Sequence, residues 1–267
     1  MRIVVCVKHV PDLSSDRAFG ADHRTVRDAV DSTLNEVDEN AVETALQLKE
    51  AASAADSGTE HEVVALTMGP SIAVDAVRRA MQMGADRGVH VCDDALAGAD
   101  YAVTAAALAA AIRTEEPVDA VVTGMAALDG LGSVIGSLLA AELGWPQLSV
   151  ARTVTWDDGV ITTHRGVDGV SETWRAATPA VVSVTDVTNS PRLARMQQIL
   201  AAKSKPVTTH AAADLGLTAD QLTSRTAVRS ATRRPEPDPE IVFDDGTGGA
   251  KLAEYLIAHD LLAKENR

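Results

Sequence analysis

The sequence is poor in cysteine, in aromatic residues and in basic residues, and each shortage excludes a class of protein. Two of its 267 residues are cysteines, and aromatic residues make up 3%. Cys6 and Cys92 lie in apolar runs, which indicates buried free thiols and gives no support to a disulfide framework or a zinc site. The 24 basic residues stand against 38 acidic ones, a net charge of −14. We therefore expect neither nucleic acid nor an anionic membrane as the main partner.

Long apolar runs and clustered catalytic residues are missing as well. No apolar run is long enough to span a bilayer, and the first residues, MRIVVCV, lead directly into an apolar strand. A soluble, cytoplasmic protein without direct membrane insertion is therefore expected. The seven histidines are scattered without metal-ligand spacing, and no nucleophile–base–acid set is apparent. The sequence thus predicts no metal site and no catalytic residue.

Short apolar runs alternate with helical patterns over the first half of the chain. Strands joined by helices form right-handed crossovers, so the alternation predicts an α/β fold with a parallel sheet. Asn35 or Asp38 can cap the first helix. We expect strands at 2–7, 61–67, 88–92 and 118–123, and helices at 41–54, 71–83, 100–114 and 133–143.

The pattern changes after Pro146. Four strand-like runs separated by turn residues, at 148–156, 160–165, 170–175 and 180–185, predict an antiparallel meander added to the parallel sheet. Residues 207–248 are extended and rich in proline, threonine and aspartate, and 250–264 form an amphipathic helix. An arm of this kind needs a surface that holds it. We expect an α/β domain at 1–214 and a C-terminal arm at 215–267.

Residues 118–144 combine an apolar run, a loop with three glycines and a helical stretch. In this arrangement free backbone N–H groups and the helix dipole point at the loop, where they favour an anion. Ser133 can cap the helix or bind a phosphate. An ordinary strand-to-helix turn, whose glycines only make room, explains the spacing equally well. Ligands of parallel sheets bind at the carboxyl ends of the strands, where residues 7–9, 68–70 and 124–133 would converge.

Residues 189–206 carry basic side chains and no acidic one, in a chain that is otherwise acidic. The charges belong to Arg192, Arg195, Lys203 and Lys205, and the apolar residues Met196, Ile199 and Leu200 recur at helical spacing. Periodicity alone favours a small helix packed on the core. A short, basic helix with an exposed methionine also suits a docking surface for another protein.

Eight segments together resemble the β subunit of electron transfer flavoprotein, also called the small subunit or FixA-like family. They follow one another in the family's order over nearly the whole chain, and the likeness is weakest at 215–245. Asp168, Gly169, Glu172 and the segment PAVV at 179–182 are specific to this family. The segments are VCVKHVPD (5–12), LNEVDENAVETALQLKE (34–50), TMGP (67–70), RRAMQMGADRGVHV (78–91), TGMAALDG (123–130), LGWPQ (143–147), RGVDGVSETWRAATPAVVSV (165–184) and SPRLARMQQILAAKSK (190–205).

The resemblance implies an adenine nucleotide α-hydrolase-like domain in a heterodimer with an α subunit, which holds most of the FAD. It implies a structural AMP in this chain and electron transfer from acyl-CoA dehydrogenases or other flavin dehydrogenases to a quinone oxidoreductase, as in fatty acid β-oxidation. Met196 occupies the position of the family's hydrophobic anchor, and Arg192, Arg195, Ile199 and Leu200 accompany it in partner docking. The residues that match the AMP pocket are Cys6, Asn35, Glu36, Val37, Asp38, Met68, Gly124, Met125, Ala126, Ala127, Leu128, Asp129, Gly130, Leu131, Gly132, Ser133, Val134 and Ile135.

Two positions depart from the family pattern. Leu13 replaces a frequent aromatic residue near the flavin, and Gly166 replaces a glutamate. The loop DGLGSVIG at 129–136 also has few side-chain ligands, so backbone N–H groups would carry more of the binding. Alternatives to the AMP-binding carrier are a bifurcating FixAB-type subunit with a second FAD in place of AMP, and a stand-alone nucleotide-binding regulator of the universal-stress-protein type. An ATP-using enzyme would need a glycine-rich loop where KHVPD stands.

Overall fold

The computed structural model describes residues 1–27, 30–235, 238–239 and 241–262. They divide into two compact units, residues 1–231 and the described residues from 232 onward. Among the described residues, no helix is both long enough and apolar enough to cross a membrane.

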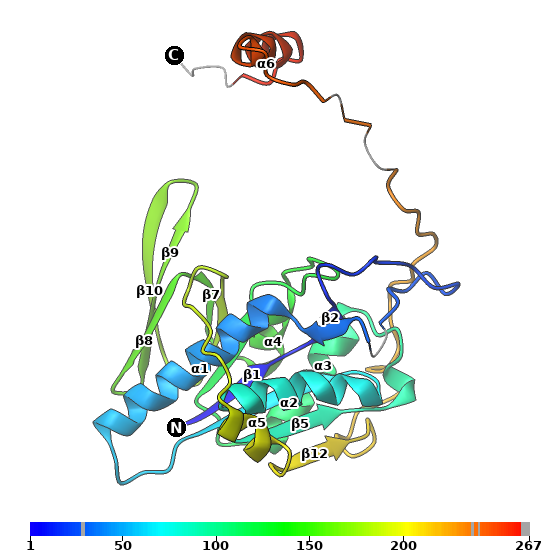
Figure 1. Ribbon diagram of the computed structural model, residues 1–267. Helices are drawn as coiled ribbons and strands as arrows, with labels where there is room; N and C mark the ends of the chain where they lie inside the picture. Colours follow the sequence, from blue (N-terminus) through cyan, green and yellow to red (C-terminus); the bar gives the residue numbers. More distant parts are fainter. Residues whose placement is uncertain (28–29, 236–237, 240, 263–267) are drawn as a thin grey trace. The chain divides into compact units, whose positions relative to one another are not determined.

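The first unit is built on a seven-stranded sheet in which every neighbouring pair is parallel (Figure 1). This confirms the α/β fold with a parallel sheet. The chain places β1 in the interior, between β4 and β6. In sheet order the strands are β12 (Val207–His210), β5 (Arg87–Val91), β4 (Glu62–Met68), β1 (Arg2–Cys6), β6 (Ala120–Gly124), β11 (Ala180–Val184) and β7 (Gln147–Ala151).

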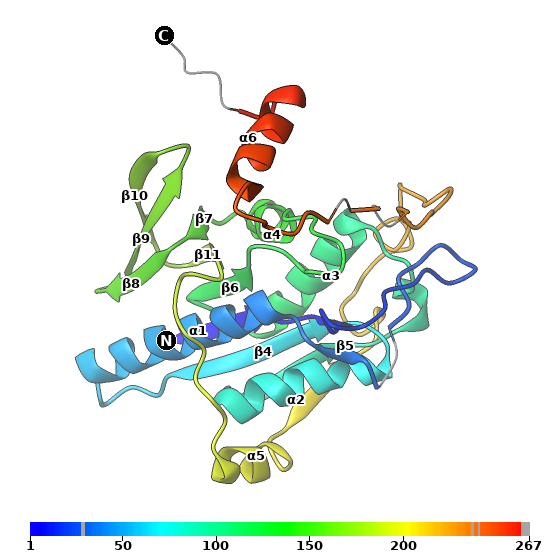
Figure 2. The same cartoon turned by 45° about the horizontal axis from the view of Figure 1, so that its top comes forward.

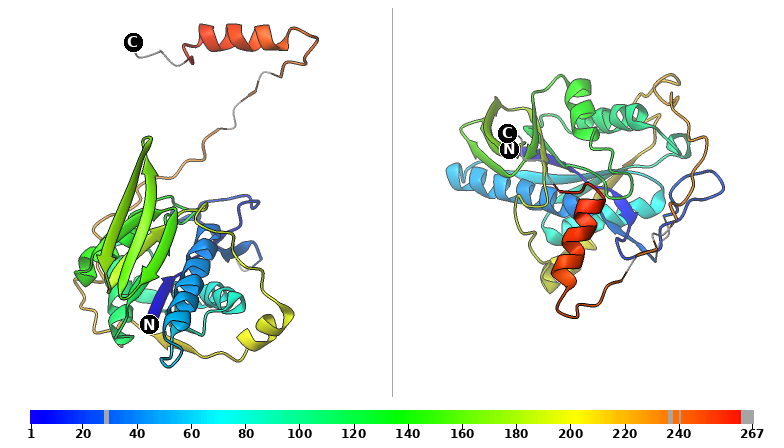
Figure 3. Two further views of the ribbon diagram at one scale, coloured as in Figure 1. Left: turned by 90° about the vertical axis from the view of Figure 1, so that its left-hand side faces the viewer. Right: turned by 90° about the horizontal axis from the view of Figure 1, so that it is seen from above.

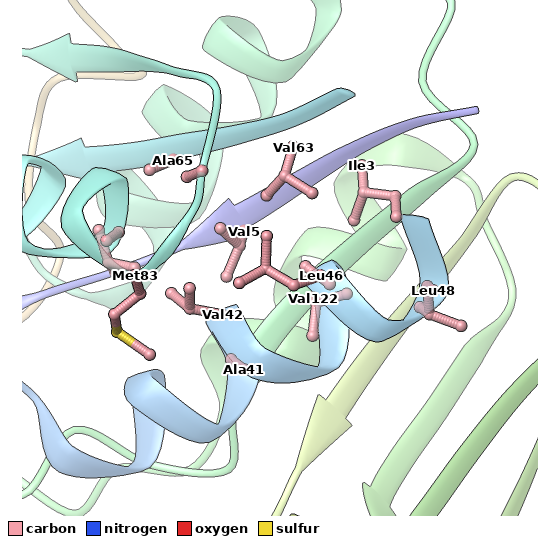
Figure 4. Packing of buried hydrophobic residues seen from close by; sticks show 14 of the residues in the cluster. Ile3, Val5, Ala41, Val42, Leu46, Leu48, Val63, Ala65, Met83 and Val122 are labelled. Carbon is pink, nitrogen blue, oxygen red and sulfur yellow. The ribbon is translucent and has the colours of Figure 1, made fainter. Parts of the chain in front are cut away.

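Helices cover both faces of this sheet, which explains why the central strands are continuous apolar runs. The helices α1 (Glu36–Ala55) and α2 (Val74–Met83) pack on one face, and α3 (Tyr101–Thr114) and α4 (Ile135–Leu143) pack on the other (Figure 2). Alternate strand residues serve the two layers. Ile3, Val5, Val63 and Val122 meet Val42 and Leu46 of α1 (Figure 4), whereas Val4, Val64 and Val121 meet Val103 and Leu108 of α3.

The predicted meander is only partly correct. A three-stranded antiparallel sheet forms from β8 (Thr153–Asp157), β9 (Val160–Val167) and β10 (Val170–Ala177), and β9 and β10 extend beyond the main sheet (Figure 3). The runs expected at 148–156 and 180–185 do not belong to it as predicted. Val150 has a positive φ, and the first run breaks at Arg152 into β7 and β8. All five residues of β11 are buried, as expected for an interior parallel strand.

Shorter elements complete the first unit. In the excursion after β1, β2 (His9–Pro11) pairs with β3 (Ser32–Leu34), and the 3-10 turns η1 (Ser71–Ala73) and η2 (Asp94–Leu96) precede α2 and α3. The short helix α5 (Met196–Ala202) lies against α2. Leu215, Leu217 and Leu222 pack on the α3–α4 side of the core, so this unit continues beyond residue 214, where the domain boundary was expected.

The second unit contains one helix, α6 (Gly248–Ala258), among its described residues. Asp244 accepts hydrogen bonds from the backbone N–H groups of Gly246 and Gly248, which stabilises the turn before the helix. No residue of α6 is buried in the chain itself, and Leu252, Tyr255 and Ile257 are all exposed. The helix ends at Ala258, earlier than the sequence predicts, and the last expected residues, 263–264, lie outside the described part of the chain.

Candidate functional site

The carboxyl ends of β4, β1 and β6 form one edge at the centre of the sheet. From β1 the chain proceeds outward to β4 and β5 and then returns to β6 on the other side of β1. Such a reversal in strand order leaves a crevice between helices that run in opposite directions from the sheet, where ligands of open α/β sheets bind. Cys6 and Met68 stand at this edge and pack against the layer of α3 and α4. The predicted convergence of the three strand ends is therefore present in the fold.

The first turn of α4 opens at this edge with its backbone N–H groups uncapped. Among the described residues, no side chain makes a capping hydrogen bond to α4, and the N-cap position is held by Val134. Of the two roles expected for Ser133, capping is not found, because Ser133 precedes the N-cap residue and its backbone is left-handed with φ +54°. Leu131 is left-handed as well, with φ +49°. Left-handed residues in a loop before a helix turn successive N–H groups toward one point, which creates a concavity for an anion.

A buried hydroxyl group points into the same turn. Thr123 is 4% exposed, and its Oγ1 atom has no hydrogen-bond partner in the part of the chain that the structure describes. A Cβ atom at Gly136, in the first turn of α4, would lie 3.2 Å from this oxygen. Buried polar groups are normally hydrogen-bonded, so an orphaned hydroxyl beside an uncapped helix terminus fits a polar ligand group at that point. The residues present therefore suit a phosphate.

The loop from 124 to 134 is held in place by Asn35 and Arg17. Asn35, which is fully buried, donates its side-chain amide to the carbonyl of Ala126 at 3.0 Å and accepts from the N–H of Leu128 at 2.9 Å. Arg17 donates to the carbonyl of Leu128 at 2.7 Å. Asn35 occupies the N-cap position of α1 but makes no capping hydrogen bond. Its side chain thus fixes the loop instead of the helix end, which was not predicted from the sequence.

Asp129 is the one acidic side chain in this loop, and two cations compensate it. Its carboxylate, 1% exposed, pairs with Lys8 Nζ at 2.9 Å and with the guanidinium of Arg27. Burial acts to raise the pKa of Asp129, but the charges of Lys8 and Arg27 outweigh it and hold the pKa below its usual range. Because two cations neutralise its charge, Asp129 does not repel an anionic ligand in the loop.

The glycines of the loop differ in what surrounds them. A Cβ atom at Gly124 would lie 2.5 Å from Asp38 Oδ1, and one at Gly132 would lie 2.1 Å from Tyr101 Oη, whereas one at Gly130 would meet nothing within 4 Å. Gly124 and Gly132 therefore make room for α1 and α3. Gly124 and Gly132 thus act as spacers, as the simpler interpretation of this turn expects. That role is compatible with an anion at the N–H groups of residues 131–136.

Asp38 and Cys6 are the buried titratable groups beneath the site. The structure places Asp38 inside α1, where it is 6% exposed and accepts from the N–H of Lys8 at 2.9 Å, so it is not the helix cap expected as one option. Burial raises the pKa of Asp38 to about 7. Burial, assisted by the nearby Asp38, raises the pKa of the Cys6 thiol to about 12. Cys6 therefore stays protonated and contributes bulk to the site, not nucleophilicity.

The other residues predicted for the pocket lie around these groups. Glu36 and Val37 form the first residues of α1, Met125 donates its N–H to Val184, and Ala127 accepts the N–H groups of Gly130 and Leu131. Tyr101, at the start of α3, was missed by the sequence analysis. The sequence does contain a signal for its position: Asp100 is a helix-capping residue, so the residue after it, Tyr101, is the first residue of α3. In the described part of the chain no cluster of His, Cys, Asp and Glu side chains is suited to a metal ion.

We expect the replacement Asn35→Ala to loosen this loop. The N–H of Leu128 and the carbonyl of Ala126 would lose their partner, and an unpaired buried polar group costs roughly 1–3 kcal/mol. The thermal midpoint should fall accordingly, and proteolysis within 124–134 should become faster. The control Ser171→Ala removes an exposed side chain and should change stability by less than about 0.5 kcal/mol. Equal stability of the two variants would contradict a role for Asn35 in holding the loop.

The structure separates the basic segment into half-buried charges that are paired within the chain and exposed charges. Arg192 pairs with Glu43 and Glu50, and Lys205 donates to the carbonyls of Met81 and Ala85, so neither faces a partner protein freely. Arg195 and Lys203 are exposed.

The apolar residues of this segment are exposed to different degrees. Met196 is 70% exposed, Leu200 is 58% exposed and Ile199 is half-buried. Leu193 is 87% exposed and was not among the predicted docking residues. Large exposed apolar side chains therefore lie next to exposed cations, as the predicted docking role would require. We use the term docking surface for Leu193, Arg195, Met196, Leu200 and Lys203.

The fold and this strand edge define an α/β protein with a doubly covered parallel sheet and an uncapped helix turn at its switch point. Residues 24–215 match the family model of the electron transfer flavoprotein domain. The electron transfer flavoprotein subunit beta of Mycobacterium tuberculosis (strain ATCC 25618 / H37Rv) is 38% identical over 265 residues, 97% of this chain and 99% of that protein. The mouse protein of the same name is 34% identical over 238 residues, 88% and 90% of the two chains. The chain belongs to the electron transfer flavoprotein β-subunit family.

A relative with another printed name also aligns with most of the chain. Subunit CarD of the caffeyl-CoA reductase–Etf complex of Acetobacterium woodii is 33% identical over 217 residues, 81% of this chain and 80% of that protein. The resemblance deduced from the motifs is confirmed by these matches. Membership of this family also excludes the stand-alone regulator of the universal-stress-protein type.

Proposed function

We propose that this chain is the β subunit of a heterodimeric electron transfer flavoprotein. In this proposal the α subunit holds most of the redox FAD, and the heterodimer carries electrons from acyl-CoA dehydrogenases or other flavin dehydrogenases to a quinone oxidoreductase of the respiratory chain. The β chain supplies a nucleotide-stabilised scaffold and a docking surface. Electron transfer between flavins depends on their distance and orientation, so no catalytic side chain of β is required.

The observation that carries the nucleotide part is the uncapped first turn of α4 beside the orphaned hydroxyl of Thr123. A phosphate of AMP would accept hydrogen bonds from the N–H groups of residues 133–136 and from Thr123 Oγ1. The nucleoside would lie toward Cys6 and Met68 at the ends of β1 and β4. Bound in this way, AMP would connect three strand ends with the loop and α4, which makes it a structural ligand.

The decisive measurement counts nucleotides in the purified heterodimer. The chain is coexpressed with the α subunit encoded by the same genome, the complex is denatured, and AMP and FAD are quantified in the supernatant. One AMP and one FAD per heterodimer are expected. Two FAD and no AMP would replace the proposal by its alternative, a bifurcating FixAB-type subunit with a second FAD. A colourless complex without adenylate would contradict both.

The C-terminal helix supports the partner part of the proposal. Leu252, Tyr255 and Ile257 are exposed in the chain by itself, and a helix of 11 residues with no buried residue has little reason to be stable alone. We propose that the arm formed by the described residues from 232 onward packs on the α subunit. This arm is shorter than the one expected from the sequence, 215–267, because Leu215, Leu217 and Leu222 pack on the chain's own core.

We expect Met196→Ala to weaken docking of the electron donor. Met196 is 70% exposed and lies at the first position of α5, so its removal takes contact area from a partner without leaving a cavity in this chain. Loss of an apolar anchor costs about 1–2 kcal/mol of binding, so kcat/KM with a reduced acyl-CoA dehydrogenase should fall roughly tenfold. FAD content should not change. The neighbouring Gln197→Ala is the control, and equal rates for both variants would remove Met196 from the docking role.

A further inference from the structure

The segment that leads into the docking surface has no helix or strand of its own. Residues 185–195 connect β11 to α5 without regular secondary structure. A segment of that length would ordinarily fluctuate, because only its two ends have backbone–backbone hydrogen bonds to neighbouring elements: the Thr185 N–H donates to the carbonyl of Ala151 in β7, and the Arg195 carbonyl accepts from Ile199 in α5. Its side chains instead attach it to α1 at several points.

The first attachment is an amide clasp between Asn40 of α1 and Asn189. Asn40 donates its side-chain amide to the carbonyls of Asp186 and Asn189, at 3.3 and 2.9 Å. Asn189 returns two hydrogen bonds, to the carbonyl of Asn40 at 3.1 Å and to Thr44 Oγ1 at 2.9 Å. Asn40 is 5% exposed and Thr44 is 2% exposed, so water does not compete effectively for these groups.

The second attachment is an ion pair between Arg192 and Glu43, one turn further along α1. The Glu43 carboxylate accepts from Arg192 Nε at 2.7 Å, from Nη2 at 3.0 Å and from the backbone N–H at 3.2 Å. The side chain of Glu43 is 6% exposed, whereas Glu50, the other partner of Arg192, is 60% exposed. A planar guanidinium held by two parallel hydrogen bonds fixes direction as well as distance.

Asn40, Glu43, Thr44 and Glu50 lie on one face of α1, because they are spaced three, four and ten residues from the first. Arg192 directly precedes Leu193, the first residue of the docking surface, and Met196 follows three residues later. A docking residue next to a fixed attachment is already ordered before binding. It therefore loses less conformational entropy on binding, and the affinity is higher. In this arrangement Arg192 contributes to docking by fixing the segment to α1, and its charge does not contact the partner.

We infer that Glu43 is a positioning residue for electron-donor docking, acting through Arg192 on the segment that presents Leu193 and Met196. Neither Glu43 nor Asn40 belongs to the docking surface itself. The inference rests on the proposed function insofar as it concerns the donor, while the attachment of residues 186–195 to α1 can be measured without any donor. Docking then requires the attachment of residues 186–195 to α1 as well as exposed apolar and basic side chains.

The test compares Glu43→Gln, Asn189→Ala and the control Glu50→Gln in the complete heterodimer. The amide introduced by Glu43→Gln would direct N–H groups at the guanidinium, and Glu50→Gln alters only the exposed partner. With a purified acyl-CoA dehydrogenase, reduced by its acyl-CoA substrate, the KM for the heterodimer should rise roughly fivefold in the first two variants while kcat stays within about twofold. FAD content should equal that of the unmodified protein. The control should leave both parameters unchanged.

Amide hydrogen exchange provides the second readout. Peptides covering 186–195 should exchange faster in Glu43→Gln and Asn189→Ala, with no change in β6 or α4. If Met196→Ala raises KM but Glu43→Gln changes neither KM nor exchange, the inference is overturned and the proposed function stands. If Met196→Ala has no effect on KM, the proposed docking role fails, and exchange in 186–195 alone decides: faster exchange supports the attachment by Glu43 and unchanged exchange overturns it.

Discussion

The variant Ser133→Asp should purify with its fold intact and without AMP. Ser133 is exposed and left-handed, a backbone conformation that aspartate and asparagine tolerate better than most residues. A carboxylate just before α4 complements the helix dipole, so the chain without nucleotide should be no less stable. The same carboxylate repels a phosphate at the helix terminus. At an effective dielectric between those of protein and water this costs about 3 kcal/mol, which is more than a hundredfold in affinity.

The matched control is Ser133→Asn, which has the same shape and the same tolerance of the left-handed conformation but carries no charge. It should retain AMP close to one equivalent per heterodimer. The measurement is release of adenylate by denaturation, together with the melting temperature in the presence and absence of added AMP. Added AMP should raise the melting temperature of the control and leave that of Ser133→Asp unchanged. Retention of AMP by both variants would place the phosphate elsewhere.

The second large effect expected is a change in how stability depends on pH when Asp38 is replaced by asparagine. Burial raises the pKa of Asp38 to about 7 in the folded chain, above the ordinary value of 3.8. The folded state thus binds this proton more tightly than the unfolded state. The stabilisation is complete below 3.8 and is lost as the pH rises through about 7. Asp38→Asn removes the titration.

The stability of Asp38→Asn relative to the unmodified protein should therefore improve by about 2–4 kcal/mol between pH 4 and pH 8. A constant cost of the amide, from altered hydrogen bonding to Lys8, would shift the difference at every pH without affecting its slope. The measurement is unfolding of the heterodimer in urea across that pH range. Asp12→Asn is the control. Asp12 accepts hydrogen bonds from Ser14 that lower its pKa, so its contribution has the opposite sign. A pH-independent difference for Asp38→Asn would show that Asp38 is ionised in the folded chain.

The elements that could be predicted from the sequence are the strands that are buried in an apolar environment on both faces of the sheet. RIVVC at β1 and AVVTG at β6 are apolar throughout, and both strands lie inside the sheet with helices on each face. The turn from β6 to α4 could be recognised as well, because glycines and an apolar run leave few other arrangements. The same reasoning failed at 148–156, where the run contains no proline or glycine to indicate that it breaks at Arg152.

Side-chain partners were the part that local reasoning assigned wrongly. Asn35 has the residue type and position of a helix cap, but its amide binds the 124–134 loop, about 90 residues away in the sequence. Arg192 has the charge and position of a docking residue, but it pairs with Glu43 and Glu50. In both cases a local role was open to the side chain, and a distant group with better burial and geometry took it.

The amino-acid sequence by itself determined the alternation of strands and helices, the parallel sheet and the family, since these depend on periodicity and on motifs that are contiguous in the chain. Only the tertiary structure decided which polar groups are satisfied and which remain open. Thr123 is left without a partner and α4 without a cap because the described chain around them supplies none, while Glu43 and Asp129 are neutralised by cations that the fold brings from elsewhere. Burial turns these pairings into large energies, and burial is a property of the folded chain.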